Sequence, residues 1–391
     1  MRIAYITDET FPNNSASGLQ IIHTLSALAA VGADVDLVYP VKPAQRRDPD
    51  ALRAALQAHY HVRCGFGLVP LPTHLGDRRV PIKVATGAAA TVQVLRGGYD
   101  LVHTRTLAPI LPCLAASLPV IFETYRPLTQ QYRASRRAFR AVGRHPAFAG
   151  LVTHSKLARQ AFVDDGVPAE KVRTLYNGFD PSAFATPRTP PEARALLGLP
   201  ERPTVVYTGR IAPVKNTDLL LDAAERTRGG QWVLAGATDS EEAQPYVERA
   251  ATLSHVHLLG YLTGERLTLA LQAADVLVIP PSAVPLTRFG TTVLPIKLFT
   301  YLAAGRAIVA GQLPDAEELL TDDVNACLVR PDDVGALATA VDGLLASPER
   351  RARLAEAALA TSAELTWEAR ARRIVAFAEE RLSAMGRSSV G

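Results

Sequence analysis

Residues 203–224 have the sequence PTVVYTGRIAPVKNTDLLLDAA. A β-rich run leads into a glycine turn, and a helical pattern follows. Such a turn lets backbone amides approach a ligand, and the start of the helix favours an anion. Arg210 and Lys215 lie in this turn, at a spacing that lets both reach one pyrophosphate. The spacing is not that of a Walker A motif, and the plain alternative is a solvated loop with two exposed cations.

Strand-like and helical runs alternate on both sides of this segment. Further β-rich runs lie at 2–7, 34–40, 100–104, 119–124, 150–155, 172–178, 231–236, 255–261, 275–280, 306–311 and 326–331. Residues 185–203 are rich in proline and are typical of a linker. Buried strands separated by helices indicate parallel βαβ units. We therefore predict an α/β protein with two doubly wound Rossmann-like domains, residues 1–182 and 183–366. A last helix, within residues 367–391, completes the second domain or crosses back to the first.

Two further segments combine turn and strand signals. Residues 289–311, FGTTVLPIKLFTYLAAGRAIVAG, predict a helix from about Pro295 to Gly305, with a start that again suits an anion. A plain loop–helix–strand unit explains the same pattern. Residues 176–180, YNGFD, predict a tight turn between the domains, because asparagine and glycine tolerate positive φ.

A basic stretch occupies residues 125–145. It has no acidic residue, and its arginines share one face of a predicted helix: Arg133, Arg136, Arg137, Arg140 and Arg144. This pattern is compatible with an anionic membrane surface or a phosphate-bearing acceptor. A solvated arginine face on a helix packed against the core is the alternative.

Composition excludes several classes of protein. The 42 Lys and Arg against 38 Asp and Glu give a net charge of +4, too small to predict nucleic-acid binding. Three distant cysteines form no zinc spacing or disulfide framework, which favours a reducing, cytoplasmic setting. The most apolar window, 107–122, is interrupted by prolines and is too short to span a bilayer. No dehydrogenase glycine motif opens a helix, and no hydrolase nucleophile elbow is present.

Taken together, these segments resemble glycosyltransferase family 4, whose members have the GT-B fold. The resemblance runs almost from end to end, and its most specific parts are the TGR…K turn at 208–215 and the PIKLFTYLAAGRAIVA segment at 295–310. It implies two Rossmann-like domains, the first binding an acceptor and the second a nucleotide-diphosphate sugar, with the last helix crossing back to the first. It also implies retention of anomeric configuration and no metal or other cofactor.

The resemblance assigns roles to individual residues. Arg210 and Lys215 correspond to the positions that hold the donor diphosphate. The other donor-binding positions are Gly18, in a loop whose amides approach donor and acceptor, and Gly209, Leu294, Ile296 and Thr300. Positions close to the sugar or the acceptor are Ser17, Glu123, Tyr125 and Thr292.

The sequence also departs from the family pattern. Two glutamates of the family correspond here to Thr292 and Thr300, and a histidine near the donor sugar corresponds to Tyr125. Tyrosine is a poor base at neutral pH. In the mechanism usually proposed for the family, the leaving phosphate takes the acceptor proton, so that a histidine is not strictly required.

Three functions are consistent with these residues. The first is a retaining hexosyltransferase in which Arg210 and Lys215 neutralise the leaving diphosphate, with Glu123 and Tyr125 facing the sugar or acceptor. The second is a GT-B protein that binds a nucleotide or a partner without transfer, which the missing glutamates favour. The third is a nucleotide-sugar epimerase. The expected setting is the cytoplasm, with contact to the inner face of the membrane through the basic helix.

Overall fold

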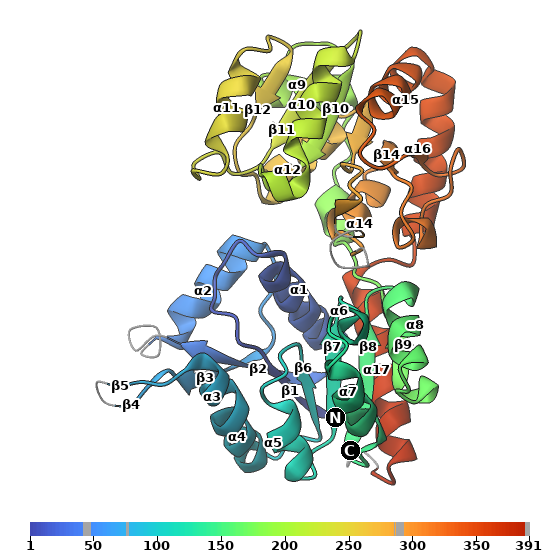
Figure 1. The fold of residues 1–391 in the computed structure, drawn as a ribbon. Helices are drawn as coiled ribbons and strands as arrows, with labels where there is room; N and C mark the ends of the chain where they lie inside the picture. Colours follow the sequence, from blue (N-terminus) through green and yellow to red (C-terminus); the bar gives the residue numbers. More distant parts are fainter. Residues whose placement is uncertain (42–47, 76–77, 285, 287–292, 388–391) are drawn as a thin grey trace. The chain divides into compact units, whose positions relative to one another are not determined.

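Two compact units make up the chain. The structure is a computed structural model that describes residues 1–41, 48–75, 78–284, 286 and 293–387. Unit 1 comprises Met1–Asn177 and Trp367–Gly391, and unit 2 comprises Gly178–Thr366. Each unit contains one parallel sheet flanked by helices (Figure 1). The prediction of an α/β fold with two Rossmann-like sheets is confirmed.

The sheet of unit 1 has seven strands in the order β3-β2-β1-β6-β7-β8-β9. Their bounds are β1 Arg2–Ile6, β2 Asp34–Val41, β3 Gly67–Pro72, β6 Leu101–Thr104, β7 Val120–Thr124, β8 Phe148–Thr153 and β9 Val172–Thr174. The chain order reverses between β1 and β6, which pair in parallel. In doubly wound sheets, ligands bind outside the carboxyl ends of the strands at this switch point.

Helices follow the strands of unit 1. They are α1 Ala16–Ala30, α2 Pro49–Tyr60, α3 Ile82–Val84, the π-helix η2 Ala85–Ala89, α4 Ala90–Gly97, α5 Ile110–Ala115, α6 Leu128–Gln131, α7 Ser135–Arg144, α8 Lys156–Asp164, the 3-10 turn η3 Ala169–Lys171 and α17 Trp367–Ala384. The short strands β4 His74–Leu75 and β5 Arg78–Arg79 pair outside the sheet. Helix α17 is the last helix of the chain, and it shares an apolar core with α1 and β1.

Strand β3 was not predicted from the sequence. It contains Pro70 and Pro72, which cannot donate to a neighbouring strand. The strand nevertheless forms because it lies at the edge of the sheet, where it pairs with β2 alone.

The sheet of unit 2 has six strands in the order β12-β11-β10-β13-β14-β15. Their bounds are β10 Thr204–Thr208, β11 Gln231–Ala235, β12 Val256–Leu258, β13 Val276–Val278, β14 Ala307–Gly311 and β15 Cys327–Val329. All the pairs are parallel, and the chain order reverses between β10 and β13. The turn singled out from the sequence, 208–215, therefore starts at the switch point of this sheet.

Helices also connect the strands of unit 2. They are α9 Pro190–Leu197, α10 Thr217–Arg226, α11 Gln244–Ala251, α12 Gly264–Gln272, α14 Lys297–Ala303, α15 Val334–Ala346 and α16 Pro348–Ser362. The 3-10 turns are η4 Pro181–Phe184, η5 Pro213–Lys215 and η6 Ala316–Glu318. A capping box starts α9: the hydroxyl of Thr189 accepts from the Glu192 amide, and the Glu192 carboxylate accepts from the Thr189 amide.

Candidate active site

The turn after β10 gathers positive charge at the switch point of unit 2. Gly209 adopts φ +144°, a conformation that side chains rarely adopt. Arg210 follows it, is exposed, and forms an ion pair with Glu242. Lys215 ends the 3-10 turn η5 and is also exposed. A surface ion pair contributes about 0–1 kcal/mol, so Arg210 can exchange Glu242 for a bound anion at little cost.

A third cation, Lys297, approaches the same turn from the start of α14. Its ammonium lies 3.9 Å from the ring centroid of Tyr207 on β10. A Cβ atom at position 209 would stand 2.5 Å from Lys297 Nζ, so the end of the lysine side chain would have to move if another residue replaced the glycine. The hydroxyl of Tyr301 on α14 accepts a hydrogen bond of 2.8 Å from the Thr208 amide, which fixes the helix against the strand end.

Burial and the repulsion of a neighbouring cation lower the pKa of both lysines. Burial, with Lys215 as a second cause, holds the pKa of Lys297 well below its usual range. Desolvation and the charge of Arg210 lower the pKa of Lys215. An anion bound at the turn would relieve this repulsion, because it favours the charged form of each lysine.

The other residues of unit 2 that the resemblance assigns to donor binding lie in α14 or just before it. Leu294 is buried and Ile296, which is half-buried, caps the helix. The hydroxyl of Thr300 donates to the carbonyl of Lys297 at 2.9 Å, and its lone pairs can still accept. Thr292, the other threonine at a glutamate position, lies outside the described residues.

In unit 1, Gly18 lies inside helix α1 rather than in a loop. Ser15 caps this helix, and its hydroxyl accepts a hydrogen bond of 2.8 Å from the Gly18 amide. That amide is therefore already used within the protein. A Cβ at position 18 would meet Asn13 Oδ1 at 2.3 Å, which explains the glycine by close packing. Ser17 is half-buried, and its hydroxyl oxygen lies 3.3 Å from Arg105 Nη1.

Glu123, at the end of β7, is fully buried and does not face solvent. Its carboxylate accepts from His103 Nε2 at 2.7 Å, from His154 Nε2 at 2.7 Å and from Gln20 at 2.6 Å. Arg370, from helix α17, donates to it at 3.0 Å. We call these side chains, with Arg105, the Glu123 cluster. In this structure the carboxylate is enclosed by protein groups and ties the ends of several strands together.

Burial and neighbouring charges shift the pKa values of Glu123 and His154. Burial raises the pKa of the Glu123 carboxyl, but Arg370 and the two histidine hydrogen bonds outweigh it and hold the pKa well below its usual range. Burial lowers the pKa of His154 to about 4, against the opposing effect of Glu123. At neutral pH the carboxylate is thus charged and His154 is neutral. Residues 176–180 form no turn and have no positive φ, so the predicted tight turn is wrong. Asn177 of this segment lies 3.4 Å from the other ring nitrogen of His154 and so supports the cluster.

Tyr125 is half-buried and lines a cavity of about 870 Å³ at the carboxyl ends of β1, β6 and β7. Two guanidinium groups lie near its ring, with Arg126 at 5.1 Å and Arg105 at 5.8 Å from the ring centroid. The phenol therefore stands in a positively charged setting, next to the switch point of unit 1.

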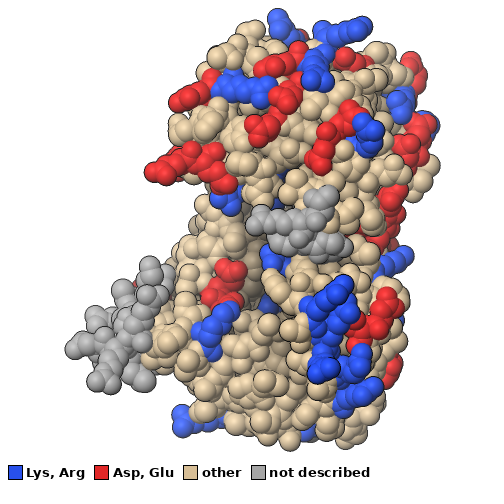
Figure 2. Space-filling model, in the orientation of Figure 1, with Lys and Arg blue, Asp and Glu red and all other residues tan. Residues whose placement is uncertain are grey.

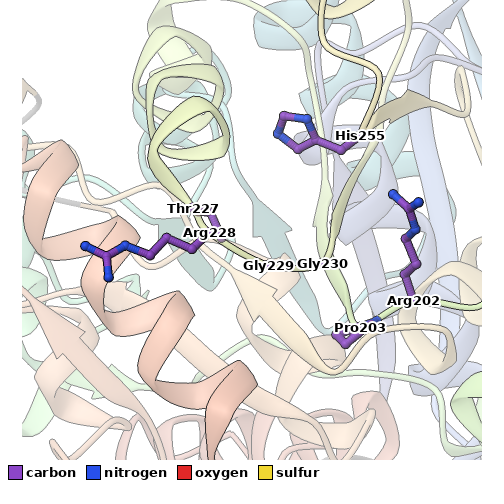
Figure 3. A pocket seen from close by; sticks show the side chains of 7 residues that line it. All are labelled: Arg202, Pro203, Thr227, Arg228, Gly229, Gly230 and His255. Atoms are coloured by element: carbon purple, nitrogen blue, oxygen red, sulfur yellow. The ribbon is translucent and has the colours of Figure 1, made fainter.

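A second pocket, of about 360 Å³, lies in unit 2 at the opposite end of the sheet (Figure 3). It is lined by residues that precede β10, β11 and β12, among them Pro203, Gly230 and His255. In Figure 3 the side chains of Arg202 and Arg228 extend away from each other. Because ligands of doubly wound sheets bind at the carboxyl ends, this pocket is not the candidate site.

Four of the five arginines of the predicted basic helix lie on α7, and Arg133 lies in the turn that precedes it. Figure 2 shows basic side chains gathered over the region where Figure 1 places this helix. Arg136 pairs with Asp165 at 3.2 Å, and Arg140 donates to the Asp165 carbonyl at 3.2 Å. Among the five arginines, the side chains of Arg133, Arg137 and Arg144 make no hydrogen bond or ion pair with another described residue.

Comparisons with known proteins identify the chemistry. Residues 18–183 match the family described as Glycosyltransferase Family 4, and residues 202–347 match the family described as Glycosyl transferases group 1. Together these matches cover most of the chain. These matches confirm the resemblance to glycosyltransferase family 4. The two parallel sheets and the cationic turn agree with glycosyltransferase activity.

Curated relatives of this glycosyltransferase include three bacterial enzymes. A phosphatidyl-myo-inositol mannosyltransferase of Mycolicibacterium smegmatis is 26% identical over 90% of this chain and 86% of its own length. A D-inositol 3-phosphate glycosyltransferase of Stackebrandtia nassauensis is 29% identical over 72% and 63%. An α-D-kanosaminyltransferase of Streptomyces kanamyceticus is 31% identical over 49% of each chain.

Solved structures share the GT-B fold. HepE of Anabaena, in complex with UDP-glucose, aligns with a TM-score of 0.73 and 19% identity over 98% of this chain and 100% of its own. Sucrose-phosphate synthase of Thermosynechococcus elongatus aligns with a TM-score of 0.77 and 20% identity over 98% and 99%.

Membrane-spanning helices and metal-binding clusters are absent from the described residues. No helix among them is both long and apolar enough to cross a bilayer. They also contain no group of three or more histidine, cysteine or acidic side chains placed to hold a metal ion.

Sequence reasoning missed several residues of these sites. Arg105 directly follows a predicted strand, and its place at a strand end beside the switch point was a usable signal. Lys297 is a cation at the start of an otherwise apolar helix, which was a weaker signal. Nothing in the sequence indicated that Arg370 reaches Glu123.

Proposed function

We propose that unit 2 binds a nucleotide-diphosphate sugar and that the enzyme transfers a hexosyl group from it to an acceptor hydroxyl. The observation that carries this proposal is the group of three cations around Gly209: Arg210, Lys215 and Lys297. They converge at the switch point of a doubly wound sheet, where such ligands bind. Cations that are in place before reaction stabilise the charge that develops on a leaving diphosphate.

The three cations Arg210, Lys215 and Lys297 also support a reaction that needs no metal. In many transferases a divalent ion supplies positive charge to the leaving phosphates, and here three side chains offer it. We further propose retention of anomeric configuration, as in the family. The burial of Glu123 supports a mechanism in which the leaving phosphate, and not this carboxylate, takes the acceptor proton.

The acceptor is proposed to bind unit 1 at the cavity lined by Tyr125. The relatives named for phosphatidyl-myo-inositol and D-inositol 3-phosphate transfer sugars to polyol hydroxyls, and we propose a polyol-type acceptor for this enzyme. Tyr125 donates a hydrogen bond to the sugar or the acceptor, a role for which phenol is suited.

A turnover panel tests this function. The full chain is incubated with UDP-, GDP- and ADP-sugars and a mixture of polyol acceptors, and nucleoside diphosphate release and glycosylated product are measured. We expect one donor to give product whose anomeric proton has the same configuration as the donor, with EDTA leaving the rate unchanged. An inverted product or loss of rate in EDTA would contradict the retaining or the metal-free proposal, respectively.

A second candidate function is binding without transfer, which the threonine at position 300 favours. Under this alternative, nucleotide sugar binds but no product forms with any acceptor. An epimerase would instead change the sugar of the donor with no acceptor present. The same panel, run with and without acceptors, distinguishes the three functions.

We also propose that α7 contacts anionic membrane surfaces. Its arginines without protein partners are free to meet lipid headgroups, at roughly 1 kcal/mol each near the surface. Vesicle co-sedimentation at low salt should show binding to anionic but not neutral lipid, weakened in an Arg133→Gln, Arg137→Gln, Arg144→Gln variant. Equal sedimentation with both lipids would leave α7 as a solvated face.

A further inference from the structure

The pocket of about 360 Å³ in unit 2 lies at the amino ends of β10, β11 and β12, at the other end of the sheet from the turn at 208–215. Its lining contains Arg202, Arg228 and His255 but no acidic residue. Acidic side chains nevertheless outnumber basic ones in residues 178–366, by 23 to 16. The pocket therefore gathers positive charge within an acidic unit.

The two arginines of this pocket are not neutralised by the protein. Both are exposed, and their side chains make no hydrogen bond or ion pair with another described residue. Neighbouring acidic residues are engaged elsewhere: Glu201 pairs with Arg194 at 2.7 Å, and Asp342 accepts a hydrogen bond of 3.0 Å from the backbone amide of Arg228. Because no ion pair has to be broken, both guanidinium groups can turn toward an anion at little cost.

The positive charge of the pocket reaches the histidines at β12. Burial lowers the pKa of His257, and the charges of His255 and Arg202 lower it further. Such an effect requires the three side chains to lie near one another. The ring of His255 is held in place, because its Nε2 donates a hydrogen bond of 2.9 Å to the carbonyl of Ala224.

Two glycines form the part of the lining between the arginines. Figure 3 shows Gly229 and Gly230 between Arg228 and Arg202. The amides of both glycines donate to no other described residue. A Cβ atom at position 229 would have no heavy atom within 4 Å, so no side chain covers this part of the pocket. Free backbone N–H groups next to guanidinium groups are suitable donors for phosphate oxygens.

We propose that this pocket binds a small soluble anion with two phosphate groups, held by Arg202 and Arg228 and by the amides of Gly229 and Gly230. The site is separate from the turn at 208–215, so the inference goes beyond the proposed function. Guanidinium groups match phosphate oxygens in pairs, and an arginine on each side of the glycines suits a ligand with more than one phosphate. The volume lies within the range of small-molecule pockets, about 300–1,000 Å³.

Calorimetry on the full chain tests the class of ligand. Pyrophosphate, fructose 1,6-bisphosphate and inorganic phosphate are titrated into Lys215→Ala, in which the proposed donor site is weakened. We expect pyrophosphate or the bisphosphate to bind about tenfold or more tightly than phosphate. Tight binding of pyrophosphate alone indicates adjacent phosphates in the ligand, and tight binding of the bisphosphate alone indicates separated ones. If neither binds more tightly than phosphate, the proposal is overturned.

Arginine variants made in the same background locate the ligand. Arg202→Gln with Arg228→Gln should weaken binding of the tighter probe at least tenfold, because charge-assisted contacts are lost. Arg266→Gln is the matched control, since Arg266 is an exposed arginine of α12 that does not line the pocket. Its affinity should be unchanged. Equal affinities in the control and in the double variant would overturn the proposal.

A charge placed in the lining gives a second, independent test. Position 229 has open space around its Cβ and no positive φ, so a side chain there should leave the fold intact. Gly229→Asp should weaken binding of the same probe at least tenfold through repulsion, whereas Gly229→Asn, of the same shape but uncharged, should retain most of it. Equal affinities in the two variants, with unchanged thermal denaturation, would contradict a site between the arginines.

Titration of the wild type, Lys215→Ala and Gly229→Asp with UDP, GDP and ADP separates this inference from the proposed function. Nucleotide binding that is lost in Lys215→Ala and kept in Gly229→Asp supports two separate sites. Pyrophosphate binding that is lost in Lys215→Ala and unaffected by the pocket variants overturns the second site and leaves the donor proposal standing. Binding that depends on Gly229, with no nucleotide binding in the wild type, overturns the donor proposal instead.

Discussion

The two units share one sheet architecture but hold their positive charge in opposite ways. In unit 2 the cations Arg210 and Lys215 lie exposed on a short turn, and a neighbouring surface carboxylate is the partner of one of them. In unit 1 Arg105 and Arg370 are buried around a single carboxylate. The first arrangement is easily rearranged for a ligand, whereas the second is rigid and costly to disturb. The comparison separates residues that are proposed to bind the donor from residues that hold the strand ends of unit 1 in place.

The largest expected effect comes from removing the buried carboxylate. Glu123→Ala leaves two buried guanidinium groups without a counter-charge, and breaking a buried pair in this way costs about 3–5 kcal/mol. Thermal and urea denaturation should show this loss. Glu242→Ala, which removes the exposed partner of Arg210, is the matched control and should change stability by less than about 1 kcal/mol. Similar costs for the two variants would mean that the Glu123 cluster does not organise unit 1.

Acid should destabilise the protein through His154. Its pKa is about 4 in the folded state against 6.5 for an ordinary histidine, so the unfolded chain binds the proton more readily. The stabilisation is complete above about pH 6.5 and is lost as pH falls toward 4, by about 3 kcal/mol. The lowered pKa of Glu123 acts in the same direction at still lower pH. His154→Gln should flatten the dependence of unfolding free energy on pH between 6.5 and 4. An unchanged slope in that variant would contradict the assignment.

Lys215→Ala should act on binding and not on stability. It removes charge-assisted contacts worth roughly 1.5–3 kcal/mol, so that affinity for a nucleoside diphosphate falls about 10- to 150-fold. Arg330→Ala is a suitable control, because Arg330 is an exposed cation of unit 2 paired with Asp333. Calorimetry that shows equal affinity in the wild type and Lys215→Ala would remove the turn from the donor site.

The same contrast explains what sequence reasoning could reach. Arg210 and Lys215 are close together in the chain, so that strand, turn and helix signals were enough to place them at one ligand site. The Glu123 cluster combines residues of α1, β6, β7 and α17 with His154, which lies between β8 and α8. Only the folded chain brings these residues together. Glu123 was singled out, but the sequence carries no sign that five side chains would enclose it.

Fold prediction failed where local signals conflict with tertiary context. The sheets followed from buried strands alternating with helices, but β3 was missed because Pro70 and Pro72 argue against a strand. Gly18 was assigned to a loop by resemblance, whereas Ser15 caps α1 early enough to include it. Both errors concern the ends or edges of elements, where one neighbouring residue decides the outcome.

The smallest expected effect is at Thr300, where the family has a glutamate. A neutral acceptor contributes roughly 0.5–1.5 kcal/mol and a charged one roughly 1.5–3, so Thr300→Glu should tighten nucleoside diphosphate binding about 5- to 30-fold. The gain requires ribose hydroxyls, and a 2′,3′-dideoxy analogue should not show it. Thr300→Gln introduces a side chain as large as glutamate but without its charge, so its gain in nucleoside diphosphate affinity should be smaller.

Because Lys297 lies close to position 300, the Thr300→Glu experiment distinguishes two partners for the new carboxylate, ribose and Lys297. Thr300 lies one helical turn after Lys297 and already donates to its carbonyl. A carboxylate at position 300 can therefore pair with the Lys297 ammonium instead of with ribose. That pairing would neutralise part of the anion site and weaken the normal and the dideoxy ligand equally. A gain confined to the normal ligand places ribose beside α14, and an equal loss on both ligands shows that the threonine preserves the charge of Lys297 for the diphosphate.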